Sequence, residues 1–139
     1  MTRIAFVCVG NAGRSQIATA YAERERAQRD RDRDRDIDIV TGGVDPAGHV
    51  HDDVVEALEE DGIDISDRSP RRITPEDVED ATHIVTMGCS ADDFTPDGWD
   101  GATEQWDLEH PSSNDLEAVR AQRDEIHDRV IELFDRLEV

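Results

Sequence analysis

The chain is predicted to be an α/β protein whose parallel sheet is covered by helices on both faces. Short apolar runs at residues 3–8, 37–43 and 83–87 are typical of buried strands. Segments with helical propensity, or with apolar residues at helical spacing, lie between them. Strands that alternate with helices favour a parallel sheet. Neither a repeat nor a linker divides the chain, so residues 1–139 are expected to form one domain.

The predicted helices rest on separate signals. Residues 14–28 consist largely of good helix formers, and residues 51–61 place apolar side chains at helical spacing. Thr74, followed by Pro75 and two acidic residues, is typical of a helix start. Residues 113–138 carry a long apolar stripe, which predicts an amphipathic helix that closes the domain.

The region before this last helix is predicted to be rich in loops. Residues 90–105 are polar and interrupted by glycine and proline, whereas residues 106–108 predict a short fourth strand. Trp99 and Trp106 are expected to pack against the sheet edge, with a place at a substrate entrance as the alternative. His127, on the last helix, is expected to face solvent.

The composition is strongly acidic. The formal net charge is −20, and all 15 basic residues are arginine. This charge repels phosphate backbones and anionic lipids, so neither nucleic acid nor a membrane is expected as a partner. No apolar run approaches the ~20 residues that span a bilayer. Such a surface is typical of a halophilic protein, because in high salt it stays hydrated and its self-repulsion is screened.

The cysteine content indicates a cytoplasmic protein. Cys8 and Cys89 are too few for a disulfide framework, and the N-terminal MTRIAFVCVGN fits a first strand better than a signal peptide. In a reducing compartment these thiols are either buried and inert or reactive. Their neighbours have to decide between the two.

The turn after the first strand, CVGNAGRS from Cys8 to Ser15, indicates chemistry on an oxyanion. Its glycines and Asn11 allow successive N–H groups to point inward and form a nest for an anion. The helix that begins near Arg14 adds its positive N-terminus, and the planar guanidinium can hold two oxyanion oxygens. These features favour a thiolate at Cys8. The turn lacks the lysine of a Walker loop and the G-x-G-x-x-G of a dinucleotide loop.

The chain resembles the low-molecular-weight protein tyrosine phosphatases and the related thioredoxin-coupled arsenate reductases. The segments that carry the resemblance are CVGNAGRSQ, HVHDDVVEALEEDGIDIS (49–66), VTMGCSAD (85–92) and WDLEHP (106–111). It implies a three-layer α/β sandwich with a four-stranded parallel sheet, and no metal or other cofactor. It also implies that Cys8 attacks phosphorus or arsenic, while Asn11 shapes the loop and Ser15 assists the thiolate. The residues expected to bind the oxyanion are Val9, Gly10, Asn11, Ala12, Gly13 and Arg14.

One alternative within this family is a phosphatase that acts on phosphotyrosine. It needs a general acid to protonate the leaving phenolate and a base to activate water. The family usually has an aspartate directly before a proline in the late loop, whereas this chain has His110 before Pro111. Glu109, His110 and Asp107 are the candidates to replace that aspartate.

The preferred alternative is an arsenate reductase. That branch typically has glutamine after the Arg-Ser pair and a cysteine after the third strand, and this chain has Gln16 and Cys89. The resemblance implies that Cys89 attacks the Cys8–arsenic adduct, expels arsenite and leaves a Cys8–Cys89 disulfide. Many such reductases have a third cysteine about seven residues further on, where this chain has Thr95. Either a thioredoxin-like or small-thiol partner reduces the disulfide directly, or Cys89 is inert.

A third alternative is a module that binds arsenate or phosphate, or senses redox state, without turnover. The complete set of Cys8, Arg14 and Ser15 favours an enzyme over this module, because anion binding alone needs no thiol.

The acidic surface gives a testable prediction about salt. Without screening, repulsion among the excess carboxylates destabilises the compact state, so the melting temperature should be lower in dilute buffer than in molar salt. Thermal denaturation followed by circular dichroism measures both values. Equal melting temperatures would contradict the halophilic interpretation.

Overall fold

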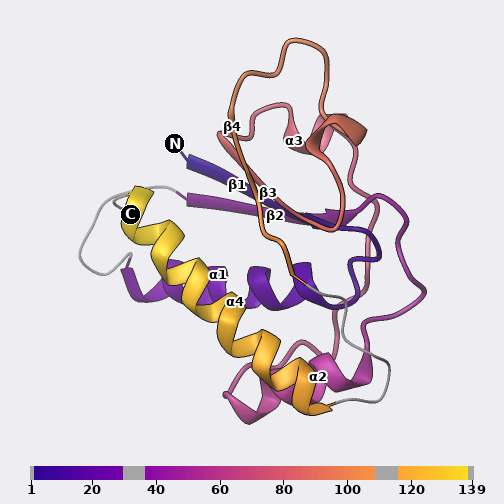
Figure 1. Cartoon of the computed structure of the whole chain (residues 1–139), viewed down its shortest axis with the longest axis vertical. Coiled ribbons are helices and arrows are strands. Elements are labelled where there is room, and N and C mark those ends of the chain that lie inside the picture. Colours follow the sequence, from indigo (N-terminus) through magenta and orange to yellow (C-terminus); the bar gives the residue numbers. More distant parts are fainter. Residues whose placement is uncertain (1, 30–36, 109–115, 138–139) are drawn as a thin grey trace.

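The computed structural model describes residues 2–29, 37–108 and 116–137 (Figure 1). The strands are β1 (Thr2–Cys8), β2 (Ile37–Gly43), β3 (His83–Met87) and β4 (Ala102–Gln105). They form one parallel sheet in the order β2-β1-β3-β4. The helices are α1 (Arg14–Arg29), α2 (Asp52–Glu60), α3 (Pro75–Val78) and α4 (Leu116–Leu137), and η1 (Ala91–Asp93) is a 3-10 helix. In these ranges no helix has both the length and the apolar character needed to cross a membrane.

The predicted α/β fold with a four-stranded parallel sheet is confirmed. Helices α1, α2 and α4 lie on one side of the sheet and α3 on the other (Figure 1). In β1, Ile4 and Phe6 belong to the large core under α1 and α4, whereas Ala5 and Val7 belong to a smaller core on the α3 side. Neither face of this central strand is exposed to solvent, which explains its unbroken apolar run.

The fourth strand lies earlier than predicted, at Ala102–Gln105 rather than 106–108. It is one of the two edge strands of the described sheet and its side chains are mostly exposed, so it lacks the apolar pattern of the other three. Trp106 and Leu108 are buried just beyond it. Trp106 packs near Phe6, with ring centroids 6.0 Å apart, and the indole N–H of Trp99 donates to the Ala81 carbonyl at 3.0 Å. The expectation that both tryptophans pack is therefore confirmed.

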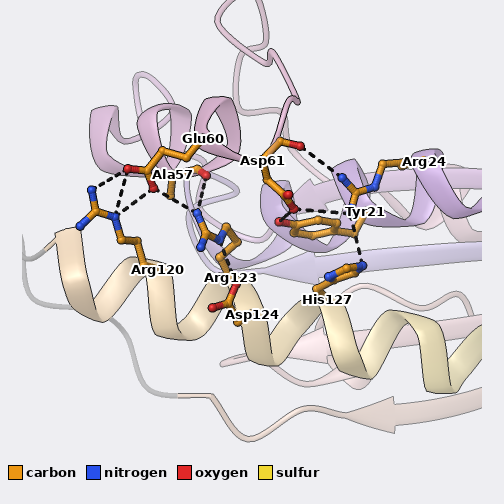
Figure 2. A network of polar contacts seen from close by, with 9 residues as sticks. All are labelled: Tyr21, Arg24, Ala57, Glu60, Asp61, Arg120, Arg123, Asp124 and His127. Atoms are coloured by element: carbon orange, nitrogen blue, oxygen red, sulfur yellow. Dashed lines mark hydrogen bonds and ion pairs between the residues drawn. The ribbon is translucent and has the colours of Figure 1, made fainter.

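His127 does not simply face solvent, and that prediction is wrong. Its ring stacks on Tyr21 of α1, with ring centroids 4.3 Å apart (Figure 2). The Tyr21 hydroxyl donates to Asp61 Oδ2 at 2.7 Å, and Arg24 lies within 3.3 Å of His127 Nε2. Burial, together with the Asp61 contact, raises the pKa of Tyr21 above its usual range. The sequence pattern missed His127 because this part of α4 is largely polar and its partners come from α1 and the end of α2.

The segment after α2 lies close against the end of β2. The Gly43 N–H donates to the Arg71 carbonyl at 2.9 Å, and the Ile73 N–H donates to the Gly43 carbonyl at 3.0 Å. A Cβ at Gly42 would lie 2.9 Å from the Ile73 nitrogen, which is too close for any side chain. The two glycines at the end of β2, Gly42 and Gly43, therefore let a distant segment approach the sheet where the strand ends.

Gly42→Ala tests this close approach. The added methyl group forces the Ile73 backbone to move, so we expect a loss of about 1–3 kcal/mol in the free energy of unfolding. Gly48→Ala is the matched control, because a Cβ there meets nothing within 4 Å. Urea denaturation of both variants measures the difference, and equal midpoints would contradict the close packing.

Candidate active site

The loop between β1 and α1 is held from outside by the segment that follows β2. Carbonyls of the loop accept backbone hydrogen bonds of 2.9–3.2 Å from this segment. The pairs, carbonyl first, are Cys8 with Val44, Val9 with Asp45, Gly10 with Ala47, and Ala12 with His51. In a planar trans peptide the N–H points opposite to the C=O, so the amides that follow these carbonyls turn toward the inside of the loop. The Asn11 N–H, for example, donates to Cys8 Sγ at 3.1 Å.

The side chain of Asn11 fixes the shape of this loop. Asn11 is fully buried and has a φ of 52°, in the left-handed region that asparagine tolerates better than most residues. Its Oδ1 accepts from Gln16 Nε2 at 3.2 Å and from the Arg71 backbone N–H at 3.0 Å. Its Nδ2 donates to the hydroxyl oxygens of Ser15 at 2.7 Å and Thr41 at 3.0 Å. The hydrogen-bonding capacity of the amide is thus fully used.

The same contacts set the direction of the hydrogen bond between Ser15 and Cys8. The Asn11 Nδ2 can only donate, so Ser15 Oγ accepts from it and keeps its own hydrogen for another partner. Cys8 Sγ lies 2.9 Å from Ser15 Oγ, and an ionised sulfur there would accept this hydrogen. The Cys8 sulfur, in a residue only 2% exposed, also receives a hydrogen bond from the Asn11 N–H at 3.1 Å.

Arg14, the first residue of α1, joins the loop to two other segments. Its Nη1 donates to the Leu108 carbonyl at 2.9 Å, just beyond β4. Its guanidinium also lies directly against Gly88, in the turn after β3. The predicted oxyanion arginine is therefore held between the ends of β3 and β4.

Cys89 follows Gly88 and is half-buried on the α3 side of the sheet. Its thiol donates to the Val7 carbonyl across an Sγ–O distance of 3.8 Å. Burial, and after it the charge of the neighbouring Cys8, raises the pKa of Cys89 to about 11, although Arg14 opposes this shift. In this conformation Cys89 is a neutral thiol at pH 7, and both cysteines are free of disulfide bonds.

Comparison with known proteins identifies the family. The family model described as low molecular weight phosphotyrosine protein phosphatase matches residues 3–139. The chain belongs to this family.

Relatives and solved structures in this phosphatase family include arsenate reductases. A Halobacterium salinarum protein with a provisional arsenate reductase assignment is 45% identical over 134 residues, which are 96% of this chain and 92% of the relative. A structure of an arsenate reductase in the phosphate-binding state matches with a TM-score of 0.80 at 29% identity, over 98% of each chain. The thioredoxin-dependent arsenate reductase of Corynebacterium glutamicum matches with a TM-score of 0.79 at 28% identity. That match covers 99% of this chain and 62% of the other.

Membership of the low-molecular-weight phosphatase family confirms the fold and the enzyme class predicted from the sequence. The structure brings Cys8, Arg14 and Ser15 together around the loop of residues 9–13. Their roles in a reaction stay predictions. In the described part of the chain no group of three or more His, Cys, Asp or Glu side chains is placed to hold a metal ion.

The late loop, where the family usually carries its general acid, is described only in part. Glu109 and His110, two of the candidate acids, lie outside the described residues. Asp107 is exposed between the buried Trp106 and Leu108, in the segment whose Leu108 carbonyl binds Arg14. It stays a candidate acid.

Residues that the sequence analysis did not identify complete the site. Thr41 donates its hydroxyl hydrogen to the Phe6 carbonyl at 3.0 Å and so presents a lone pair to Asn11. The Arg71 backbone binds the Asn11 side chain, and Gly88 borders Arg14. Thr41 could have been found from its place before two glycines at a strand end. The other two have no local signal, because their partners lie 60 or more residues away in the chain.

The raised pKa of Cys89 predicts a pH-dependent reactivity. Alkylating reagents attack the thiolate, so the labelling rate of native Cys89 should keep rising with pH up to about 11. In the denatured chain the rate should level off above the ordinary thiol pKa of ~8.5. Because the pKa of Cys89 is higher in the folded state, this thiol contributes to the free energy of unfolding at neutral pH. The contribution is lost as the pH rises from ~8.5 to about 11. Iodoacetamide labelling with site-resolved mass spectrometry tests this, and a native rate that levels off with the denatured one would contradict it.

Proposed function

We propose that this chain is an arsenate reductase in which Cys8 is the nucleophile and Cys89 the resolving thiol. The observation that carries the proposal is the presence of two free thiols at the C-terminal ends of the neighbouring strands β1 and β3. Cys8 is the register partner of Met87, two residues before Cys89, and the Arg14 charge acts to lower the pKa of Cys89. A phosphatase of this family uses one thiol, whereas reduction of arsenate to arsenite takes two electrons and therefore two thiols. The arsenate reductases among the similar proteins support the same assignment.

In the first step Cys8 attacks the arsenic of arsenate. A sulfur–arsenic bond forms, an arsenic–oxygen bond breaks, and the hydroxyl oxygen of arsenate leaves as water, taking up one proton to balance the one that the Cys8 thiol gives up. The inward amides of residues 9–13 and the guanidinium of Arg14 are proposed to hold the remaining oxygens, and Ser15 to stabilise the sulfur before attack.

In the second step Cys89 attacks the sulfur of Cys8. The sulfur–sulfur bond forms as the sulfur–arsenic bond breaks, and the electron pair stays on arsenic, which leaves as arsenite. Cys89 has to lose a proton and leave the Val7 carbonyl, a long sulfur contact that costs little to break. The raised pKa of Cys89 keeps it protonated in the conformation of this structure.

The resulting disulfide has to be reduced by an external dithiol. Thr95 stands where many such reductases have their third cysteine, so we propose that a thioredoxin-like partner attacks the Cys8–Cys89 bond itself. The Corynebacterium glutamicum protein, described as thioredoxin-dependent, supports this class of partner. We also propose that the protein works in a reducing cytoplasm, which agrees with its free thiols. The acidic composition and the Halobacterium relative support a host with high internal salt.

The second candidate function is phosphatase activity on phosphotyrosine. The description of the family model favours it, and the contacts of Cys8, Ser15 and Arg14 serve attack on phosphorus equally well. It requires an acid from Asp107, Glu109 or His110. A module that only binds the anion is the third candidate.

Two assays on three proteins in molar salt discriminate between these functions. The wild type, Cys8→Ser and Cys89→Ser are compared for thioredoxin-dependent arsenate reduction and for hydrolysis of an aryl phosphate. We expect arsenate reduction to fall to background in both variants, because each removes one of the two electron donors. Any slow phosphate hydrolysis should be lost only in Cys8→Ser.

Other outcomes assign the other functions. Efficient hydrolysis that survives Cys89→Ser, without arsenate reduction in the wild type, would identify a phosphatase. Oxyanion binding without turnover in the wild type would identify a binding module.

A further inference from the structure

Gly88 has an unusual place in the site. Its φ is +86°, in the left-handed region, and it lies in the turn between β3 and Cys89. A Cβ built on Gly88 would lie 2.9 Å from Nη2 and 3.0 Å from Nη1 of Arg14. Real Cβ atoms do not approach other atoms this closely, so the guanidinium occupies the space that a side chain at position 88 would need.

A side chain at position 88 would move Arg14 rather than the fold. The atoms in its way are the far end of a flexible side chain, whereas at Gly42 and Gly43 they belong to backbone. The long arginine side chain can turn away at little cost. A substitution at Gly88 would therefore displace the guanidinium from its present position without requiring the sheet to change.

The position of the guanidinium matters because it leaves Arg14 open to a ligand. Within the described residues, the Leu108 carbonyl accepts from Nη1 and Gly88 fills one side of the group without using any N–H. Arginine has five N–H donors, so most of them stay available for an oxyanion in the adjacent loop. Contact with Gly88 thus orients the guanidinium without competing with the oxyanion.

We propose that Gly88 is a positioning residue for Arg14. Its lack of a side chain leaves the space in which the guanidinium takes the geometry that binds the oxyanion. The inference rests on the proposed function only in the oxyanion-binding role of Arg14. It adds a constraint on the turn that carries the resolving thiol: the residue before Cys89 has to border the arginine of the other loop. The same contact keeps the Arg14 charge near Cys89, where it lowers the thiol pKa against the effect of burial.

Gly88→Ala is compared with Gly98→Ala as its matched control. Gly98 has nearly the same backbone conformation, with φ +83°, but a Cβ there meets nothing within 4 Å. Both variants pay the strain of a side chain in the left-handed region, and only the first displaces Arg14. The probe is inorganic phosphate, and its dissociation constant is measured from the protection of Cys8 against iodoacetamide in molar salt. Thermal denaturation records stability.

We expect Gly88→Ala to weaken phosphate binding about tenfold or more, the equivalent of losing one charge-assisted hydrogen bond. Gly98→Ala should stay within about twofold of the wild type, and the two melting temperatures should fall by similar amounts. Equal phosphate affinities in the two variants would overturn the proposal. If Gly88→Ala does not fold, Gly88→Asn and Gly98→Asn replace the pair, because asparagine tolerates the left-handed region and still places a Cβ.

A double-mutant cycle shows whether the effect runs through Arg14. In an Arg14→Lys background the planar fork is gone, so adding Gly88→Ala should change the phosphate affinity less than about twofold. A full loss of affinity in that background would mean that Gly88 acts by some other route, and would overturn the proposal. Phosphate binding needs neither Cys89 nor turnover. Failure of the wild type to reduce arsenate would therefore contradict the proposed function while these affinities still decide the role of Gly88.

Discussion

Hydrogen bonds from one buried amide, that of Asn11, connect parts of the chain that are far apart in sequence. Ser15 and Gln16 belong to α1, Thr41 to β2, and Arg71 to the segment that runs beside β2. A loop of small residues with a left-handed asparagine has little reason to hold one shape by itself. The shape of the Cys8–Ser15 loop is therefore a product of the assembled sheet, and the contacts of the Cys8 sulfur form only once β1, β2 and residue 71 are together.

The sequence predicted those parts of the protein that depend on local patterns. Strands β1 and β3 are largely buried and have apolar runs, and the Thr74 cap is present as a capping box with Asp77. The Cys8–Ser15 loop was recognisable because its glycines, arginine and serine are contiguous. The edge strand β4 was misplaced because exposed strands lack that signal, and His127 was misjudged because its partners come from other helices. The contacts of Arg71 and Gly88 arise from packing between distant segments, which no local pattern records.

The two thiols occupy different environments in the same sheet. Cys8 belongs to the large core under α1 and α4, whereas Cys89 packs on the smaller core on the α3 side. The Cys8 sulfur is in contact with Ser15 Oγ and the Asn11 N–H, whereas Cys89 follows a glycine with a left-handed backbone. This asymmetry suits a reaction in which the sulfur that receives the oxyanion stays still and the other sulfur travels.

The stacked pair of Tyr21 and His127, near the middle of α1, has a consequence for the N-terminus of that helix. Tyr21 comes seven residues after Arg14, about two helical turns, so the two residues emerge from nearly the same side of the helix. Any rotation of α1 about its long axis would have to break the stacking against α4 and the bond to Asp61. A roll of even a few degrees would swing the arginine sideways across the loop. The aromatic contact, remote from both sulfurs, thereby helps to keep Arg14 directed at the loop between β1 and α1.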